Sequence, residues 1–541
     1  MSARKKMPTK VELLQLQKLY KTDERIGERL GGVPAYLVAY WRRKKNIPKY
    51  SLPKFSENEV RNLWERYGDD EKCGLELGIS KAAFYNWRRR YGIREKPAFL
   101  KLEQLELNFP GSGASMLSSS LYGKQTVVQK AIAAAGSIEK AEVGQAVEVE
   151  PDFAASSGDI GTLLRKFRSS GLEYVWNAGR MIIAAGQFFD SKGKIMSADT
   201  RTLREFVKRQ GIRGFYDGRH GFVNQLALEN GHLLPGTLAF GTDQASSGFG
   251  AVGCLGMSID SARMANIWCK GKLELPVPAS ILVAIAGRRG RGIFAKDIAL
   301  HLMRSLASEA TEGRVLELSG SVISQMSVSE RVTMTSLTPV VKAISAVCTY
   351  DATVRRFLTG RSMTTYKPLL PDKDAEYEQI FQASIDQITP LISTGPDPAS
   401  IKPVAECEGQ PISRVVIGYG SNGRFDDFRV TADLLKGKKV HEDCQLMILP
   451  ASRSVYLEAL KKGLIRIFIE AGAIVLPAGS ECYLHDMLTN LTSDERILTT
   501  SSFADAPPEK LVRSEYFISS PATAAASAIS AEITDPTRFV R

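Results

Sequence analysis

The sequence is poor in metal-binding residues and has no long apolar run. Its seven cysteines are scattered and never spaced C-x-x-C, and its five histidines form no H-x-x-x-H pair. This pattern excludes a disulfide framework and a zinc ribbon and favours reduced thiols. No apolar run approaches the roughly 20 residues of a membrane span, and the basic N-terminus leads into no secretory signal. We therefore expect a cytoplasmic protein with no membrane partner.

The positive charge is concentrated in the first fifth of the chain. The 541 residues carry a net charge of +12, and residues 1–110 hold 24 Lys and Arg against 14 Asp and Glu. Such an asymmetry indicates an added module that meets a polyanion, most often nucleic acid. A solvated basic tail is the alternative.

The same helix signals occur twice in this segment. Thr9-x-x-Glu12 and Ser56-x-x-Glu59 match capping boxes, in which a hydroxyl and a carboxylate satisfy the orphan amides of a helix start. Each copy continues with a short segment ending in Leu-Gly and a third segment ending in Trp and basic residues, offset by 46–47 residues. The pattern predicts two all-α tri-helical units and a flexible linker, over residues 1–50, 51–107 and 108–122.

Smaller signals mark the second and third helices of each copy. We expect Asp23 and Asp70 to cap the second helices, and the third helices to begin at Pro34 and near Ser80. Glycine at the end of each second helix suits the tight turn to the third.

Each unit resembles the homeodomain-like helix-turn-helix family, whose third helix lies in the major groove of DNA. The resemblance implies double-stranded DNA as the partner. Residues expected to face bases are Tyr36, Tyr40, Lys81, Tyr85 and Asn86. Residues expected to contact phosphate are Arg42, Arg43, Lys44, Lys45, Arg88, Arg89 and Arg90. Trp41 and Trp87 are interpreted as core residues, and binding of protein or RNA is the alternative role of the units.

From residue 123 onward, short apolar runs alternate with amphipathic helical stretches. Leu446-Met-Ile-Leu449 is one such run, and Ser454–Lys462 is one such stretch. This alternation is typical of an α/β architecture with parallel strands.

The stretch ENGHLLPGTLAFGTDQASSGFGAVG at 229–253 resembles the signature of the aconitase and 3-isopropylmalate dehydratase large-subunit family. Phe294-Ala-Lys-Asp-Ile298 and the tail from Ser519 to Ile529 match further family motifs. The resemblance covers residues 123–541 and implies three α/β/α lobes around a cleft, without the separate swivel domain that completes the family's active site.

The family uses a [4Fe–4S] cluster held by three thiolates. The corresponding positions in this chain are Gly420, Gly479 and Cys482, so only one thiolate ligand remains. We therefore expect the cluster to be lost and no cofactor to be bound.

The family's acid/base residues are also replaced. The aligned positions hold Gly186, Gln187, Asn224, Gln244, Ala245, Ser336 and Ser501. Asp243, Glu317 and Asn422 remain, without the imidazole and iron groups that would work with them.

Two functions are compatible with these patterns. The first is a DNA-binding, transcription-regulatory protein whose inactive aconitase-like domain serves as a scaffold or senses a small carboxylate effector. The alternative is a hydro-lyase with altered cluster or metal ligation, working with a small swivel-type subunit.

Overall fold

The computed structural model describes residues 7–49, 55–67, 69–93, 124–158, 160–185, 197–306, 308–336, 338–362, 364–395, 397–479, 495–501 and 516–540. The chain divides into two units, Met1–Gly113 and Ala114–Arg541, and each is described by itself. The predicted linker over 108–122 lies outside the described residues. Within the described ranges, no helix has the length and apolar character needed to span a membrane.

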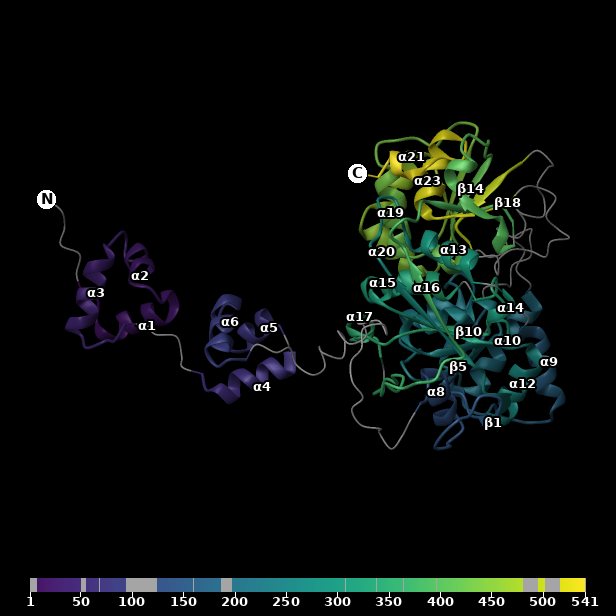
Figure 1. Ribbon diagram of the computed structural model, residues 1–541, viewed down its shortest axis with the longest axis horizontal. Helices are drawn as coiled ribbons and strands as arrows, with labels where there is room; N and C mark the ends of the chain where they lie inside the picture. Colours follow the sequence, from purple (N-terminus) through teal and green to yellow (C-terminus); the bar gives the residue numbers. More distant parts are fainter. Residues whose placement is uncertain are drawn as a thin grey trace. The chain divides into compact units, whose positions relative to one another are not determined.

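The first unit contains two sets of three helices, at the places that the repeated signals predict (Figure 1). The helices are α1 (Lys10–Tyr20), α2 (Asp23–Arg29), α3 (Ala35–Lys44), α4 (Glu57–Tyr67), α5 (Asp70–Glu76) and α6 (Lys81–Arg90). Both predicted capping boxes form: the Glu12 carboxylate accepts from the Thr9 amide at 2.8 Å, and Glu59 accepts from Ser56 at 2.8 Å. The third helices begin after Pro34 and Ser80, which confirms both predicted starts.

The predicted caps of the second helices are wrong. Thr22 caps α2 through its hydroxyl, which accepts from the Arg25 amide, and Asp23 is already inside the helix. In the second copy Asp69 precedes α5 and its carboxylate accepts from the Glu71 amide, while Asp70 is the first helical residue. Aspartate is a favoured residue at the cap of a helix, but the Asp23 and Asp70 carboxylates instead form ion pairs with other side chains.

Each set of helices closes around its own apolar core. The first core centres on Leu13, Ile26, Val38, Trp41 and Ile47, all buried. The corresponding buried residues of the second core are Val60, Cys73, Phe84 and Ile93. Trp41 is a core residue as predicted, and Trp87 is half-buried against Phe55 and Tyr91.

The second unit contains three larger sheets, which confirms the predicted α/β fold with three lobes (Figure 1). Five parallel strands run in the order β4-β3-β2-β5-β6: Gly214–Tyr216, Met181–Ala184, Phe153–Ser156, Leu238–Gly241 and Leu255–Ser258. Four parallel strands run in the order β10-β9-β8-β11: Ser345–Cys348, Val315–Ser319, Ser280–Ala286 and Gln379–Ser384. Seven strands form a mixed sheet in the order β13-β12-β18-β17-β14-β15-β16: Ile401–Pro403, Leu391–Ser393, Tyr516–Ser519, Ile497–Thr499, Arg414–Gly418, Gln445–Leu449 and Ile474–Val475. A small antiparallel pair joins β1 (Ala146–Val149) to β7 (Leu273–Pro276).

Helices pack against these sheets and bury their apolar faces. They include α8 (Val127–Ala135), α11 (Val223–Glu229), the 3₁₀ helix η2 (Gln244–Val252), α13 (Ala295–Ser305), α16 (Val328–Thr335), α17 (Ala352–Leu358), α18 (Tyr419–Asn422), α19 (Phe425–Leu435) and α23 (Pro521–Ser530). In the third lobe, α19 and α23 lie with the sheet that contains β14 and β18 (Figure 1). The near-continuous apolar strands, such as β9 and β14, fit sheets that are covered on both faces.

A buried carboxylate joins the second and third lobes. Asp297, in the first turn of α13, accepts from the Phe294 amide at 2.9 Å and from the Leu391 amide at the start of β12 at 3.0 Å. Asp297 is fully buried, and this burial raises its pKa to about 7 despite the hydrogen bonds that lower it. The lobe junction therefore contains a group that titrates near neutral pH.

We expect this carboxyl to make stability fall as pH rises. Between the ordinary aspartate pKa of about 4 and its folded value of about 7, the folded protein holds a proton that the unfolded chain does not. The contribution is thus complete below about pH 4 and is lost as pH rises through 7. Asp297→Asn should lower the melting temperature and flatten its decline between about pH 4 and 7. Parallel wild-type and variant melting curves across this range would contradict the assignment.

Candidate functional site

Two of the predicted phosphate contacts are instead structural ion pairs. In the first helical set, Arg42 donates to both carboxylate oxygens of Asp23 at 2.6 Å and to the Ile47 carbonyl at 3.3 Å. Only 6% of the Arg42 side chain is exposed, and the ion pair raises its pKa. Its guanidinium therefore faces the interior, and the prediction that Arg42 contacts phosphate is wrong.

The second helical set repeats this arrangement. Arg88 donates to Asp70 at 2.9 and 3.0 Å and to the Ile93 carbonyl at 2.9 Å, and its guanidinium lies 3.8 Å from the centre of the Trp64 ring. The phosphate role predicted for Arg88 is wrong for the same reason. The basic run after each tryptophan thus begins with a residue that holds the third helix to the second.

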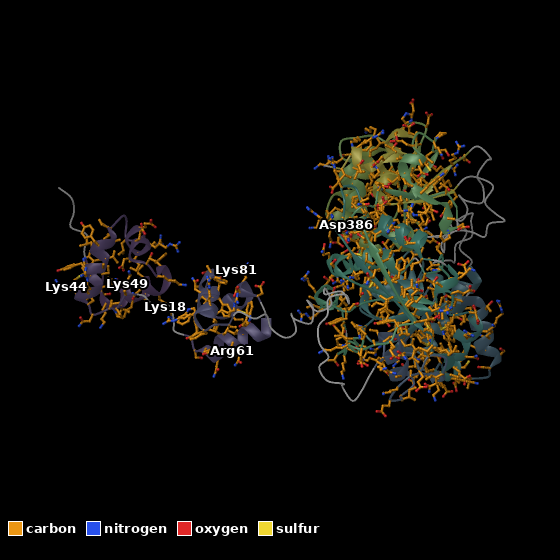
Figure 2. All side chains as sticks on the ribbon, viewed as in Figure 1. Lys18, Lys44, Lys49, Arg61, Lys81 and Asp386 are labelled. Carbon is orange, nitrogen blue, oxygen red and sulfur yellow. The ribbon has the colours of Figure 1, made fainter. Side chains whose placement is uncertain are left out.

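The other residues predicted for DNA contact lie at or near the surface. Tyr36, Tyr40 and Tyr85 are 74%, 52% and 42% exposed. Lys45 is half-buried, and the exposed members of the set are Arg43, Lys44, Lys81, Asn86, Arg89 and Arg90. Lys44 and Lys81 extend from the surface of their helices (Figure 2), and Lys81 lies 3.7 Å from the Glu71 carboxylate.

In the second unit, the polar residues of the expected cleft gather around α18, the short helix that follows β14. The turn into α18 is tight, because Gly418 has φ 137° and an added Cβ would lie 2.0 Å from the Leu449 carbonyl. Tyr419 follows with φ 72°, and its ring lies 4.5 Å from that of Phe222. This backbone turns Gly420, Ser421 and Asn422 toward α16.

A network of buried hydrogen bonds fixes this loop. Asn422 donates through Nδ2 to Thr333 at 3.1 Å and to Asp427 at 3.0 Å. Arg424 donates to the Gly420 carbonyl at 3.0 Å, to Thr333 at 3.1 Å and to the Ser421 carbonyl. The loop is therefore held by its own arginine and by α16.

Two acceptors of the loop are left without a protein partner. Ser421 Oγ and Asn422 Oδ1 are buried and have no hydrogen bond within the described part of the chain. Buried polar atoms are normally paired, so unpaired ones in one loop are typical of a site that binds a polar ligand.

A cavity of about 300 Å³ adjoins the loop, between α13, α16 and α19. It is lined by charged and polar groups that include Arg289, Lys296, Glu330, Asn422, Asp427 and Arg429. Arg289 pairs with Glu330, and Arg429 lies 3.6 Å from Asp426. Lys296 is buried, and its ammonium donates to the Ser501 carbonyl at 3.2 Å.

Asp427, Arg424 and Lys296 are site residues that the sequence did not single out. Burial raises the pKa of Asp427, although the nearby Arg424 guanidinium opposes this shift. One sequence signal could have identified Asp427, which belongs to the acidic pair at the start of α19. There it completes a capping box by accepting from the Arg424 amide at 3.0 Å.

The structure brings together some of the replaced acid/base positions. Asn224 donates to the Gly420 carbonyl at 3.3 Å. A Cβ built on Gly248, in η2, would lie 3.9 Å from both Asn224 Nδ2 and Ser336 Oγ. Ser336 Oγ itself donates to the Val332 carbonyl at 2.7 Å. The positions therefore converge near α18, as the resemblance implies, but with neutral side chains.

The other two predicted remnants have different surroundings. Glu317 is buried on β9, where it accepts from the Val128 amide at 3.2 Å and the Tyr377 hydroxyl at 3.0 Å, and burial raises its pKa. Through the bond to Val128, Glu317 fixes the start of α8. Asp243 lies just before η2, and its carbonyl accepts from the Ser246 amide. Gly186, Gln187 and Cys482 lie outside the described residues, and nothing is described for the side chains of Gln244 and Ala245.

The described residues do not fit a three-thiolate cluster site. Gly479 has φ 68°, and an added Cβ would lie 3.2 Å from Gly221 Cα, so a cysteine there would be strained and crowded. Gly420 supplies only backbone atoms. Burial raises the pKa of the Cys254 and Cys348 thiols to about 12, and in the described ranges no three metal-ligating side chains gather.

Comparison with known proteins gives one consistent result. The model of the Aconitase family (aconitate hydratase) matches residues 186–411 and 399–531. The chain is 32% identical to the 3-isopropylmalate dehydratase large subunit 1 of Methanopyrus kandleri, over 77% of this chain and 100% of that protein. It is 31% identical to the probable methanogen homoaconitase large subunit of Methanosarcina mazei, over 72% of this chain and 99% of that protein. The holo-form structure of Thermococcus kodakaraensis aconitase X is similar with a TM-score of 0.39 and 13% identity, over 70% of this chain and 90% of that chain.

These matches correct two predictions. The interpretation as a DNA-binding transcription regulator is wrong, because the relatives that match most of the chain are named as dehydratase and homoaconitase large subunits. The expectation of no cofactor is also wrong as a statement about the whole chain. The chain matches a family whose chemistry uses a [4Fe–4S] cluster, and the two glycines do not establish its loss, since residues 480–494 are not described.

Proposed function

Since the chain belongs to the Aconitase family, we propose that it acts as the large subunit of a hydro-lyase that adds water to, or removes it from, a small hydroxycarboxylate. The observation that carries this proposal is the match to dehydratase and homoaconitase large subunits over 98–100% of their lengths. A match of this extent includes all three lobes of the second unit.

The proposal includes a small partner subunit. The relatives are named large subunits, and the family resemblance implies that a separate swivel domain completes the site. We infer that a separate swivel-type subunit covers the region around α18.

The residues around α18 support binding of a hydroxycarboxylate. Lys296 brings a buried cation to the cavity wall, which suits a carboxylate. Asn422 lines the cavity, and its unpaired Oδ1 is an acceptor that a substrate hydroxyl can satisfy. Arg424 acts as a positioning residue, because it holds the carbonyls of the loop rather than lining the cavity.

Asp427 is the group best suited to move a proton. It lines the cavity, and burial raises its pKa above the ordinary aspartate value. A carboxyl with a raised pKa can exchange protons nearer neutral pH than an exposed one. We assign it the proton transfer that accompanies loss or gain of water.

The direct test is turnover of 3-isopropylmalate, the substrate named for the relatives. The full chain, purified without oxygen and mixed with the small subunit of a 3-isopropylmalate dehydratase, should form the unsaturated acid, measured by ultraviolet absorbance. Iron and acid-labile sulfide measured in the same sample would determine the cofactor content. Absence of both turnover and binding of 3-isopropylmalate or homocitrate would refute the proposal.

Within this assay, Asn422→Ala is expected to lower kcat/KM about 10- to 100-fold, because the loop loses two buried hydrogen bonds and the proposed hydroxyl acceptor. The control is Asn58→Ala, which changes an exposed asparagine of α4. Equal kcat/KM for the two variants, with unchanged melting temperatures, would remove Asn422 from the site.

A further inference from the structure

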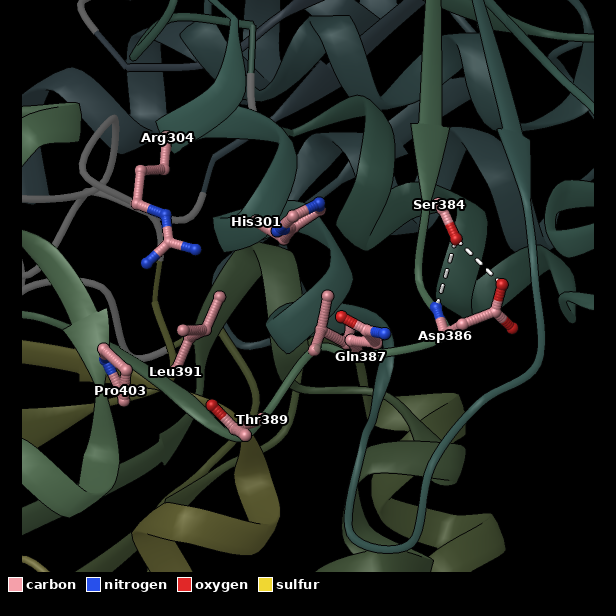
Figure 3. Close-up of a pocket in the computed structure, with 9 residues that line it drawn as sticks. His301, Arg304, Ser384, Asp386, Gln387, Thr389, Leu391 and Pro403 are labelled. Carbon is pink, nitrogen blue, oxygen red and sulfur yellow. Dashed lines mark hydrogen bonds between the residues drawn. The ribbon is translucent and has the colours of Figure 1, made fainter.

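A second cavity, of about 630 Å³, lies at the other end of α13 (Figure 3). Its walls are the last turns of α13, the segment that follows β11, and strands β12 and β13. This is the carboxyl end of a parallel strand, where open α/β sheets commonly bind ligands. Its volume is within the usual range for small-molecule sites.

One side of this cavity presents two uncommitted polar side chains. His301 and Arg304 are three residues apart on α13 and therefore share a helix face. His301 Nδ1 is buried and has no hydrogen-bond partner among the described residues. Arg304 makes no hydrogen bond or ion pair within the same ranges. Burial and the neighbouring Arg304 charge lower the pKa of His301, so its ring is neutral at neutral pH.

On the opposite side of the cavity, the charged group already has hydrogen-bond partners. Asp386 accepts from the Arg288 amide at 2.8 Å and from the Ser384 hydroxyl at 2.9 Å (Figure 3). These bonds lower its pKa, and it stays ionised. An anion is therefore attracted to the Arg304 side and repelled from the Asp386 side.

The remaining wall is partly apolar. Ile388, Leu391 and Pro403 line the cavity, and Leu391 and Pro403 come from the sheet of the third lobe. A ligand bound here would thus contact the second and third lobes together. A ligand with an apolar portion of about four carbons would bury that portion against these three apolar side chains.

We propose that this cavity binds a small monocarboxylate with a short apolar chain. The Arg304 guanidinium holds the carboxylate, the half-buried His301 imidazole donates to one of its oxygens, and Ile388, Leu391 and Pro403 surround the chain. The site shares no lining residue with the cavity beside α18. The proposal is therefore independent of the proposed hydro-lyase activity.

The test is calorimetric titration of the full chain with three probes. Isovalerate carries both the carboxylate and a branched chain, inorganic phosphate carries only the charge, and 3-methylbutanol carries only the chain. Isovalerate should bind with the highest affinity. Arg304→Gln should weaken it about 10- to 100-fold, and His301→Phe should weaken it about tenfold, since each removes a hydrogen bond to a charged group.

Matched variants decide whether binding occurs at this cavity. Arg356→Gln, which changes an exposed arginine of α17, should leave isovalerate affinity unchanged, and so should Asn422→Ala at the other cavity. Unchanged isovalerate affinity in Arg304→Gln would overturn the proposal. So would loss of isovalerate binding in Asn422→Ala alone, tighter binding of phosphate than of isovalerate, or absence of saturable isovalerate binding to the wild-type chain.

Discussion

Arg42→Ala is expected to destabilise the first helical set by about 3–5 kcal/mol, the usual effect of removing one member of a buried ion pair. The change leaves the Asp23 carboxylate, 16% exposed, without its two short hydrogen bonds and also removes the bond to the Ile47 carbonyl. Arg42→Lys should restore little, because an ammonium cannot donate in the forked geometry of a guanidinium.

Hydrogen exchange of the full chain measures this effect locally. Amides of α2 and α3 should exchange about 150- to 5,000-fold faster in Arg42→Ala, while those of α5 and α6 stay unchanged. Arg43→Ala is the matched control, because the Arg43 side chain is exposed and makes only a 3.4 Å bond to the Ala39 carbonyl. Equal protection in both variants would show that the Arg42–Asp23 pair does not stabilise the fold.

Gly250→Ala is expected to destabilise the second unit by on the order of 4 kcal/mol. A Cβ at this position of η2 would lie 1.7 Å from the Ala346 carbonyl oxygen and 3.0 Å from Val347 Cα. Both atoms belong to the backbone of β10, which pairs with β9, so no side-chain rotation relieves the overlap. The helix or the strand must move.

The midpoint of chemical denaturation, followed through the second unit, reports this change. Gly395→Ala is the control, since its Cβ would meet only the Ser400 side chain at 3.6 Å, an ordinary contact distance. A similar midpoint for the two variants would mean that η2 and β10 are less tightly packed than the structure describes.

The sequence predicts the helices of the first unit well because their signals are local. Capping boxes and the Leu-Gly turns involve residues three or four positions apart, and both third helices begin where predicted. The roles of Arg42 and Arg88 could not be obtained in this way. Whether an arginine in a basic run faces solvent or a carboxylate 18 or 19 residues away depends on how the helices pack.

In the site of the second unit, too, the sequence predicts some residues, while the role of others depends on how the elements pack. The resemblance places Gly420, Asn224 and Ser336 correctly near one another, because the order of strands and helices is retained. It does not identify Asp427 or Arg424, whose importance comes from burial and from hydrogen bonds across α16 and α19. Glu317 was expected in the cleft. Instead, it accepts hydrogen bonds from the Val128 amide at the start of α8 and from the Tyr377 hydroxyl.

The paired guanidinium and carboxylate of each helical set have a consequence for how the first unit unfolds. Arg42–Asp23 and Arg88–Asp70 have the same geometry, and each is accompanied by its own apolar core and capping box. Each helical set therefore contains its own ion pair, its own apolar core and its own capping box. We therefore expect a substitution that unfolds one helical set to leave the other folded, so that the unit opens in two separate steps.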